Sequence, residues 1–241
     1  MPEAVRAIDL NCDAGEGCGP EAELVAWVTS VNVACGLHAG DPVTARRTVE
    51  LAAAAGVAVG AHPGFPDREG FGRRALALAP REVADLVAYQ VGALWGICRA
   101  AGVRLCHVKP HGALYHLAAR DDGVAEAVVG AVRAVDPSLL VVAPPGSALV
   151  AAAARAGLRA VREGFADRAY APDGSLLPRH EPGAVIASPG QAAEQACRLA
   201  RSGAVDTLCV HGDHPHAAAV ARAVRTALEA AGFAVRAPGG A

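Results

Sequence analysis

The stretch Arg104-Leu105-Cys106-His107-Val108-Lys109-Pro110-His111-Gly112 contains the pattern that decides the fold. A short apolar run typical of a strand ends there, and its end carries a lysine between two histidines. The same event recurs at residues 11–16, 34–41, 60–64, 163–168 and 210–213. In a barrel of parallel strands all such ends lie on one rim, so polar residues from distant parts of the chain meet in one pocket. The pattern therefore predicts an α/β fold with an active site at the carboxyl ends of parallel strands.

Strand-like and helix-like segments alternate along the chain. The candidate strands are Ala7–Cys12, Val31–Cys35, Val57–Ala61, Arg104–Val108, Leu139–Ala143, Ala160–Glu163, Ala184–Ala187 and Thr207–Val210. Several are continuous apolar runs, as expected of parallel strands covered on both faces. Helical patterns occupy residues 42–55, 80–101, 123–135, 147–156, 191–202 and 215–231. With no linker or composition break, this repeat predicts one catalytic domain over residues 1–241, a parallel (β/α) barrel of seven or eight strands.

Composition limits the classes of function. Of the 241 residues, 53% are hydrophobic and 19% are charged, and the formal net charge is −2. The lack of a basic block argues against nucleic acid or an anionic membrane surface as a partner. An odd count of seven cysteines without a C-x-x-C pair argues against a disulfide framework or a zinc knuckle. Met1–Asp9 lacks the apolar region of a signal peptide, and no run approaches the ~20 apolar residues of a membrane span, so we expect a cytoplasmic protein.

Several common catalytic motifs are missing from the sequence. It contains no P-loop, no G-x-G-x-x-G that opens a helix after a strand, and no G-x-S-x-G elbow. The chain therefore offers no recognisable nucleotide cradle and no serine nucleophile of the α/β-hydrolase type.

Lys109 is the chain's only lysine, among many arginines. In an extended chain His107, Lys109 and His111 share one face. A lysine there can polarise a carbonyl, hold an anion, or act as a base if its pKa falls. Two histidines around it at a strand end favour a functional role.

Each of the other polar clusters can be interpreted either as part of a functional site or as an ordinary structural feature. Asp13 and Glu16 flank Gly15 after the first strand, and either could be a general base, an orienting group, a metal ligand or a turn carboxylate. His38 and His62 are candidate site residues or hydrogen-bonded core histidines. His211 and Asp213 are expected to pair with each other. Helix capping is an alternative for Asp213, and it also explains Asp41, which precedes Pro42.

Two loops, residues 63–79 and 165–183, are long enough to act as lids. They contain Asp67, Arg73 and Arg74, and Asp167 and Arg168, respectively. An arginine in such a loop could clamp a substrate carboxylate, although a surface ion pair is the better interpretation for Arg74.

Taken in order, the polar clusters resemble the LamB/YcsF family of 5-oxoprolinase subunits over residues 7–233. The matching segments are Asp9–Asp13 with Gly15–Gly17, Asn32–Pro42, Gly60–Asp67 with Gly70–Arg74, His107–Tyr115, Glu163–Arg168 and Val210–Asp213. The departures are small: Ala14, Leu37 and His116 stand where the family is expected to have Leu, Phe and Asn. They affect the shape of the pocket.

The resemblance implies a distorted seven-stranded barrel of the polysaccharide deacetylase type. It implies a hydrolase that acts on a cyclic amide, opening 5-oxo-L-proline to L-glutamate at the expense of ATP. ATP would be a co-substrate handled with 5-oxoprolinase subunits B and C. The family's wider association is with carbohydrate metabolism.

These arguments give a set of expected site residues. The expected catalytic residues are Asp13, Glu16, His38, Lys109, His111, His211 and Asp213. The expected substrate-binding residues are His62, Asp67, Arg73, Asp167 and Arg168. One alternative is a metal-dependent deacetylase or amidohydrolase, with a divalent cation on Asp13, His38, His62 or His111. A second is a non-catalytic lactam-binding subunit.

Overall fold

Seven parallel strands form a closed barrel in the computed structural model, which describes residues 6–18, 21–213 and 216–238. The strands are β1 (Ala7–Ala14), β2 (Ser30–Ala34), β3 (Ala58–His62), β4 (Leu105–Val108), β5 (Leu140–Ala143), β6 (Ala160–Phe165) and β7 (Thr207–Val210). Each pairs with the next, and β1 closes the ring by pairing with both β2 and β7. The expected parallel barrel is thus confirmed, with seven strands.

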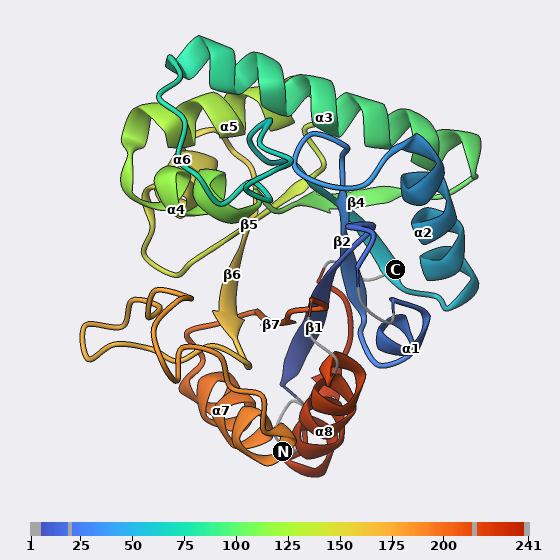
Figure 1. The fold of residues 1–241 in the computed structure, drawn as a ribbon, viewed down its shortest axis with the longest axis vertical. Coiled ribbons are helices and arrows are strands. Elements are labelled where there is room, and N and C mark those ends of the chain that lie inside the picture. Colours follow the sequence, from blue (N-terminus) through green and yellow to red (C-terminus); the bar gives the residue numbers. More distant parts are fainter. Residues whose placement is uncertain (1–5, 19–20, 214–215, 239–241) are drawn as a thin grey trace.

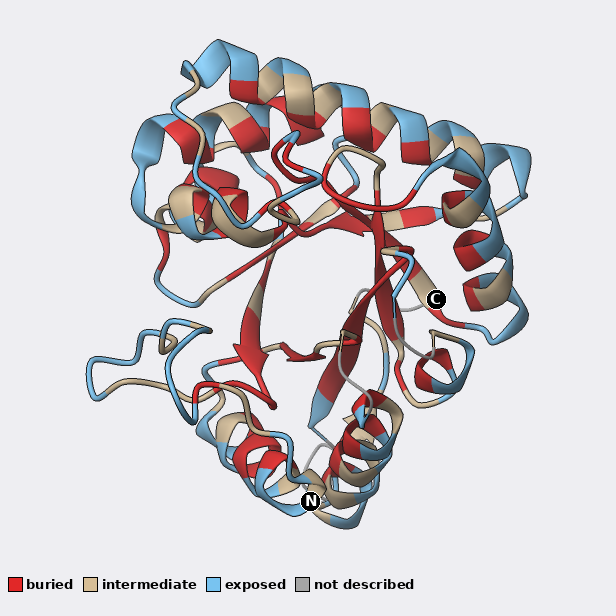
Figure 2. Ribbon diagram, in the orientation of Figure 1, coloured by how far each residue is buried: buried red, intermediate tan, exposed pale blue. Residues whose placement is uncertain are grey.

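Helices surround the barrel (Figure 1). They are α1 (Glu21–Val25), α2 (Pro42–Ala54), α3 (Pro80–Ala100), α4 (Gly112–Arg120), α5 (Asp122–Val135), α6 (Ala148–Arg155), α7 (Pro189–Ser202) and α8 (Ala217–Ala230). Figure 2 shows their buried faces turned toward the strands and their exposed faces turned outward. In α3, for example, Val83, Val87, Val91 and Leu94 repeat at helical spacing and are buried. None of the described helices has the length and apolar character that crossing a membrane would require.

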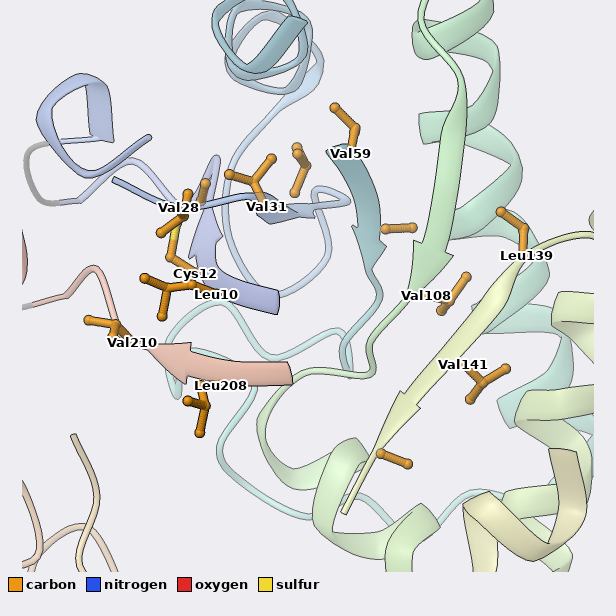
Figure 3. Close-up of a cluster of buried hydrophobic side chains, with 14 of the residues drawn as sticks. Leu10, Cys12, Val28, Val31, Val59, Val108, Leu139, Val141, Leu208 and Val210 are labelled. Carbon is orange, nitrogen blue, oxygen red and sulfur yellow. The ribbon is translucent and has the colours of Figure 1, made fainter. Parts of the chain in front are cut away.

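Along β1, apolar and polar residues alternate, and this alternation divides the fold into an apolar layer and a polar interior. Leu10 and Cys12 belong to the large core cluster that the strands share with the helices, part of which appears in Figure 3. Asn11, on the opposite face of the strand, donates a hydrogen bond to Glu163 of β6 (3.1 Å), although β7 lies between β1 and β6 in the sheet. Since a strand turns alternate side chains to opposite faces, the odd-numbered residues of β1 point into the barrel.

One predicted strand is wrong. Residues 184–187 contribute only an isolated antiparallel bridge, between Val185 and Arg168, and not a barrel strand. This segment folds back on the loop that follows β6: Ile186 N donates to Asp167 O (2.8 Å) and Ala169 N donates to Ala184 O (3.0 Å). Its apolar residues therefore belong to a long loop, residues 166–188, which we call the β6–α7 loop.

Three short elements were not predicted. The helix α1 has five residues, and β8 (Ala234–Val235) pairs with Ala7 and Ile8 of β1. The third is α4, which follows Pro110 and begins at Gly112, two residues that favour a turn. Gly112 has a φ of 52° and its Cα faces the backbone of Gly72, where a Cβ would lie 2.6 Å from the carbonyl oxygen. A glycine at this position thus allows the backbone at the start of the helix to pass close to the backbone of Gly72.

Candidate active site

A cavity of about 770 Å³ opens at the carboxyl ends of the strands. Its lining combines charged, imidazole and aromatic side chains from β1, the loop after β3, the β4–α4 turn, the β6–α7 loop and the end of β7. They include Asp13, Glu16, His62, Arg73, Lys109, His111, Tyr115, Phe165, Arg168, Arg179, His211 and Asp213. Lys109 and His211 therefore lie in one hollow, as the pattern of strand ends requires.

Lys109 is the centre of a buried charge cluster. It is 3% exposed, and its Nζ lies 3.0 Å from Asp13 Oδ1 and 2.9 Å from Glu163 Oε1. Burial alone would lower the pKa of Lys109, but the two carboxylates outweigh it and raise the pKa well above its usual range. Lys109 is therefore a charged hydrogen-bond donor rather than a base.

Asp13 is held from several sides. Its Oδ1 accepts a hydrogen bond from Asn32 (2.9 Å) as well as from Lys109, and Oδ2 lies 3.5 Å from His62 Nε2. Burial would raise the pKa of Asp13, but His62 and Lys109 outweigh it and hold the pKa well below its usual range. Asp13 is an ionised carboxylate that anchors the Lys109 ammonium, and it raises the pKa of His62 against the effect of burial.

Four side chains form a second cluster at the edge of the cavity, which we call the imidazole cluster: Glu16, His38, His62 and His111. His38 stacks on His111 with ring centroids 3.9 Å apart, and His62 stands at right angles to both. Burial, with the neighbouring His62, lowers the pKa of His38 to about 3 and that of His111 to about 2, so both rings are neutral. Burial and Asp13 raise the pKa of Glu16 to about 7.

His211 pairs with Asp167. Its Nδ1 lies 3.0 Å from Asp167 Oδ1, and its backbone N–H donates to Oδ2 of the same carboxylate (2.7 Å). A carboxylate that accepts from Nδ1 fixes the tautomer of the ring and leaves Nε2 as the acceptor. The pair has the arrangement of a general base with its orienting carboxylate.

With this geometry established, the chain can be compared with known proteins. The model of the LamB/YcsF family matches residues 8–240. The chain belongs to the LamB/YcsF family. Two relatives are named as the A subunit of 5-oxoprolinase, one from Symbiobacterium thermophilum and one from Methylococcus capsulatus. Each is 54% identical to this chain, over 98% of it and 97% of the relative.

Solved structures of similar fold fall into two groups. The lactam utilization protein of Thermus thermophilus is 50% identical, with a TM-score of 0.89 over 96% of this chain and 99% of that one. The catalytic domain of a peptidoglycan N-acetylglucosamine deacetylase from Eubacterium rectale has a TM-score of 0.56 at 12% identity, over 98% of this chain and 90% of that one. At that identity the deacetylase shares the fold alone, which confirms the expected deacetylase-type barrel.

Asp213 differs from the expectation for this LamB/YcsF chain. The partner of His211 is Asp167, not Asp213, because β6 and β7 are neighbours and their ends bring these two residues together. The Asp213 carboxylate instead accepts hydrogen bonds from the guanidinium groups of Arg73 (2.7 Å) and Arg179 (2.5 Å). Residues 214–215 are outside the described part of the chain, and the described helix that follows begins at Ala217, so Asp213 is not positioned as its cap.

Asp67 and Arg168 also lie in unexpected environments. Asp67 is not among the residues that line the cavity, since Arg74 and the Gly70 N–H hold it within its own loop. The Arg74 ion pair is thus confirmed, and Asp41 is confirmed as the cap of α2. Arg168 lines the cavity, but its guanidinium donates to the carbonyls of Leu177 (2.6 Å) and Ala184 (3.2 Å). It is positioned to shape the β6–α7 loop.

Glu163, Tyr115 and Asn11 are the functional candidates that the sequence patterns did not predict. Glu163 is buried and accepts from Tyr115 OH (2.7 Å), Asn11 and Lys109. Its place at the end of an apolar strand, directly before Gly164, was a signal that could have identified it. Asn11 begins the polar cluster at residues 11–16, but neither it nor Tyr115 was among the expected site residues, because an amide or a phenol next to apolar residues fits an ordinary core equally well.

Among the residues that the structure describes, two groups of side chains have metal-ligand composition, and in one of them Lys109 already takes the place of a cation. Asp13, Cys209 and His211 converge, but Lys109 Nζ already lies 3.0 Å from Asp13 and 3.2 Å from Cys209. In the imidazole cluster, one ligand atom from each of Glu16, His38, His62 and His111 lies within 4.8 Å of all the others. Three imidazoles and a carboxylate suit a zinc-class ion, which would supply Lewis-acid or orienting chemistry when bound.

Proposed function

We propose that this LamB/YcsF protein opens the ring of 5-oxo-L-proline to give L-glutamate, as the A subunit of an ATP-dependent 5-oxoprolinase. The observation that carries the proposal is the buried Lys109 ammonium between Asp13 and Glu163 on the floor of a cavity that also bears arginines. The substrate is a small cyclic amide with a carboxylate, so it needs a donor for the amide oxygen and a cation for the carboxylate. The names of the relatives at 54% identity support the same assignment.

The chemistry explains why ATP and partner subunits are needed. A five-membered lactam is stabilised by amide resonance and resists water. Transfer of a phosphoryl group to its carbonyl oxygen would create an electrophilic carbon and a leaving group. We assign the ATP chemistry to subunits B and C, because the sequence of this chain contains no P-loop or dinucleotide motif. This chain then supplies the hydrolytic pocket.

Each residue of the pocket has a role that fits its environment. Lys109 stabilises the negative charge that develops on the lactam or phosphate oxygen. His211, oriented by Asp167, accepts a proton from the attacking water and returns it to the ring nitrogen as the C–N bond breaks, which leaves an acyl phosphate on the former ring carbon. A second water then hydrolyses this acyl phosphate to L-glutamate and inorganic phosphate. Asp13 is a poor choice of base, because its pKa is lowered and it is bound to Lys109. Its role is to fix the position of the ammonium.

The substrate carboxylate is assigned to Arg73. Its side chain is 43% exposed and lines the cavity, stacked over Phe71. Arg168 is less suited, since backbone carbonyls already occupy its guanidinium. A guanidinium matches a carboxylate with two parallel hydrogen bonds.

The decisive experiment is an assay of Lys109→Met in the enzyme assembled with subunits B and C, with glutamate and ADP both followed. Loss of a well-placed charge stabiliser should reduce turnover about a hundredfold or more. The melting temperature of the variant separates a chemical effect from unfolding. Near-normal turnover would exclude the role of Lys109. No glutamate from the wild-type chain in any combination of subunits would exclude the function.

The two alternatives from the sequence are distinguished by related measurements. A deacetylase would release acetate from an N-acetylated sugar without ATP or other subunits. A non-catalytic lactam-binding subunit would bind 5-oxoproline, and Lys109→Met would change the affinity without changing turnover at saturation. The described residues favour the hydrolase, because an oriented histidine and a buried cation face one cavity.

A further inference from the structure

Two histidines of the imidazole cluster have ring nitrogens whose protonation is set by backbone carbonyls. His62 Nδ1 lies 2.7 Å from Lys109 O, and His111 Nε2 lies 2.8 Å from Phe71 O. A carbonyl oxygen only accepts hydrogen bonds, so each of these two nitrogens must carry a hydrogen. In a neutral imidazole the other nitrogen is then bare. His62 Nε2 and His111 Nδ1 are therefore both bare in the neutral rings.

These two nitrogens face each other at 2.9 Å. With both rings neutral, neither nitrogen could donate to the other, and two lone pairs would be opposed at hydrogen-bond distance. Such a contact is stable only if a cation stands between or beside the nitrogens. The cation is either a proton on one ring or a metal ion shared by both.

The remaining two members of the cluster decide between these cations. His38 is 1% exposed, and neither of its ring nitrogens has a hydrogen-bond partner among the described protein atoms. The same holds for Glu16 Oε1, which lies 3.5 Å from both His38 Nε2 and His111 Nδ1. Buried polar atoms are almost always satisfied. A proton between His62 and His111 leaves these atoms without a partner, whereas a metal ion gives one to both Glu16 Oε1 and His38 Nε2.

The separations agree with this choice. An ion with tetrahedral bonds of ~2.0–2.1 Å places neighbouring ligand atoms about 3.3 Å apart. The separations are 2.9 Å for His62 to His111 and 3.5 Å for Glu16 to each of His38 and His111, and all four ligand atoms lie within 4.8 Å of one another. The carbonyls of Lys109 and Phe71 also orient the rings in the way that outer partners orient metal-bound histidines.

We propose that Glu16 Oε1, His62 Nε2 and His111 Nδ1, completed by His38 Nε2, bind a divalent transition-metal ion of the zinc class. The ion would join the ends of β1, β2 and β3 to the start of α4. His38 is the weakest ligand. Its ring is nearly parallel to that of His111 (5°), so it must tilt before both rings direct a nitrogen at one ion.

The proposal goes beyond the proposed function and is tested apart from it, with neither lactam, ATP nor other subunits present. The full chain is stripped with a chelator, dialysed against Zn²⁺ or Co²⁺, and analysed for bound metal. The Co²⁺ form also has a visible spectrum that reports nitrogen and oxygen ligands. We expect about one ion per chain, and a higher melting temperature, since an ion that binds the folded state stabilises it.

Variants identify the ligands. The double variant His62→Ala/His111→Ala should lose the ion and the Co²⁺ spectrum, and His38→Ala should lose less affinity than either single change at His62 or His111. Should the double variant fail to fold, Glu16→Gln provides the test, with an expected loss of affinity of at least about tenfold. His116→Ala, a change in a histidine that lines the same cavity outside the cluster, is the matched control and should keep the ion.

Wild-type protein that binds no more metal than the double variant, or than Glu16→Gln, would overturn the proposal. A proton shared by His62 and His111 would then account for their contact. Because the measurement uses the isolated chain, a negative result leaves the oxoprolinase assay unaffected, and an inactive oxoprolinase leaves the metal stoichiometry interpretable.

Discussion

At the scale of the residue, the neighbours Arg73 and Arg74 show how different environments separate identical side chains. Arg73 lines the cavity, donates to Asp213 (2.7 Å) and stacks over Phe71. Arg74 lies outside the cavity lining, donates through Nε to Asp67 (2.8 Å), and its side chain is 61% exposed. Only Arg73 is placed to meet a substrate.

We therefore expect Arg73→Ala to raise the KM for 5-oxoproline, because a charge-assisted contact with the substrate carboxylate is lost. A bond of this kind contributes ~1.5–3 kcal/mol, which corresponds to a change of roughly 10- to 100-fold. Arg74→Ala is the matched control and should leave KM within about twofold, since Arg74 does not line the cavity. Steady-state assays of both variants with subunits B and C make the comparison. Equal effects of the two changes would contradict the assignment of Arg73.

At the scale of the element, Gly60 determines how β3 and β4 pack. The register of this pair shifts between Val59 and Gly60, where His107 of β4 crosses β3. A Cβ on Gly60 would lie 2.0 Å from His107 Nε2, the atom that contacts Asn32 Oδ1 at 2.8 Å. The absence of a side chain at residue 60 is what admits the histidine ring to the interior of the barrel.

Gly60→Ala should thus lower the free energy of unfolding by ~1–3 kcal/mol or more, the usual cost of overpacking. Gly96→Ala is the control. Residue 96 is within α3, nothing lies within 4 Å of the added Cβ, and alanine should stabilise the helix by up to ~1 kcal/mol. Urea unfolding of the two variants measures both values. A neutral Gly60→Ala would mean that His107 can leave its place without cost.

The elements that the sequence predicted well are those with a long, regular pattern. The strands of the barrel and the helices α2, α3 and α5 follow from apolar runs, helical stripes and caps such as Asp41. The segment 184–187 has an equally apolar composition, but it pairs with the β6–α7 loop because strand pairing depends on neighbours that a local window does not contain. The helix α4 was missed because Pro110 and Gly112 read locally as a turn.

At the scale of the whole molecule, Asp9 ties the barrel together where it closes. This buried carboxylate of β1 accepts from Ser30 Oγ of β2 (2.8 Å) and from Thr207 Oγ1 of β7 (2.5 Å), and also from Thr29 Oγ1 (2.7 Å). Burial raises the pKa of Asp9 from 3.8 to about 6, even though the three hydroxyls lower it. The folded protein therefore holds this proton more tightly than the unfolded chain does.

A raised carboxyl pKa predicts the direction of a pH effect. The stabilisation from Asp9 is fully present below pH ~4 and is lost as the pH rises through the folded value of about 6. Relative to Asp9→Asn, the wild type should lose up to ~3 kcal/mol of unfolding free energy between pH 4 and 7. Urea unfolding across this range tests the difference. The exposed Asp85→Asn is the control, expected to stay within about 0.5 kcal/mol of wild type throughout.

The sequence by itself determined the repeating alternation of strand and helix, the polar residues at the strand ends, and membership of the LamB/YcsF family. These features are local, since hydrophobic periodicity and short motifs can be read within a few turns of chain. Only the tertiary structure decided which polar groups became partners. Lys109 lies between Asp13 and Glu163, His211 pairs with Asp167, and His62 Nε2 faces His111 Nδ1 at 2.9 Å. The physical reason is that closing the barrel brings together residues about a hundred positions apart, and burial then makes each contact between charges or lone pairs decisive.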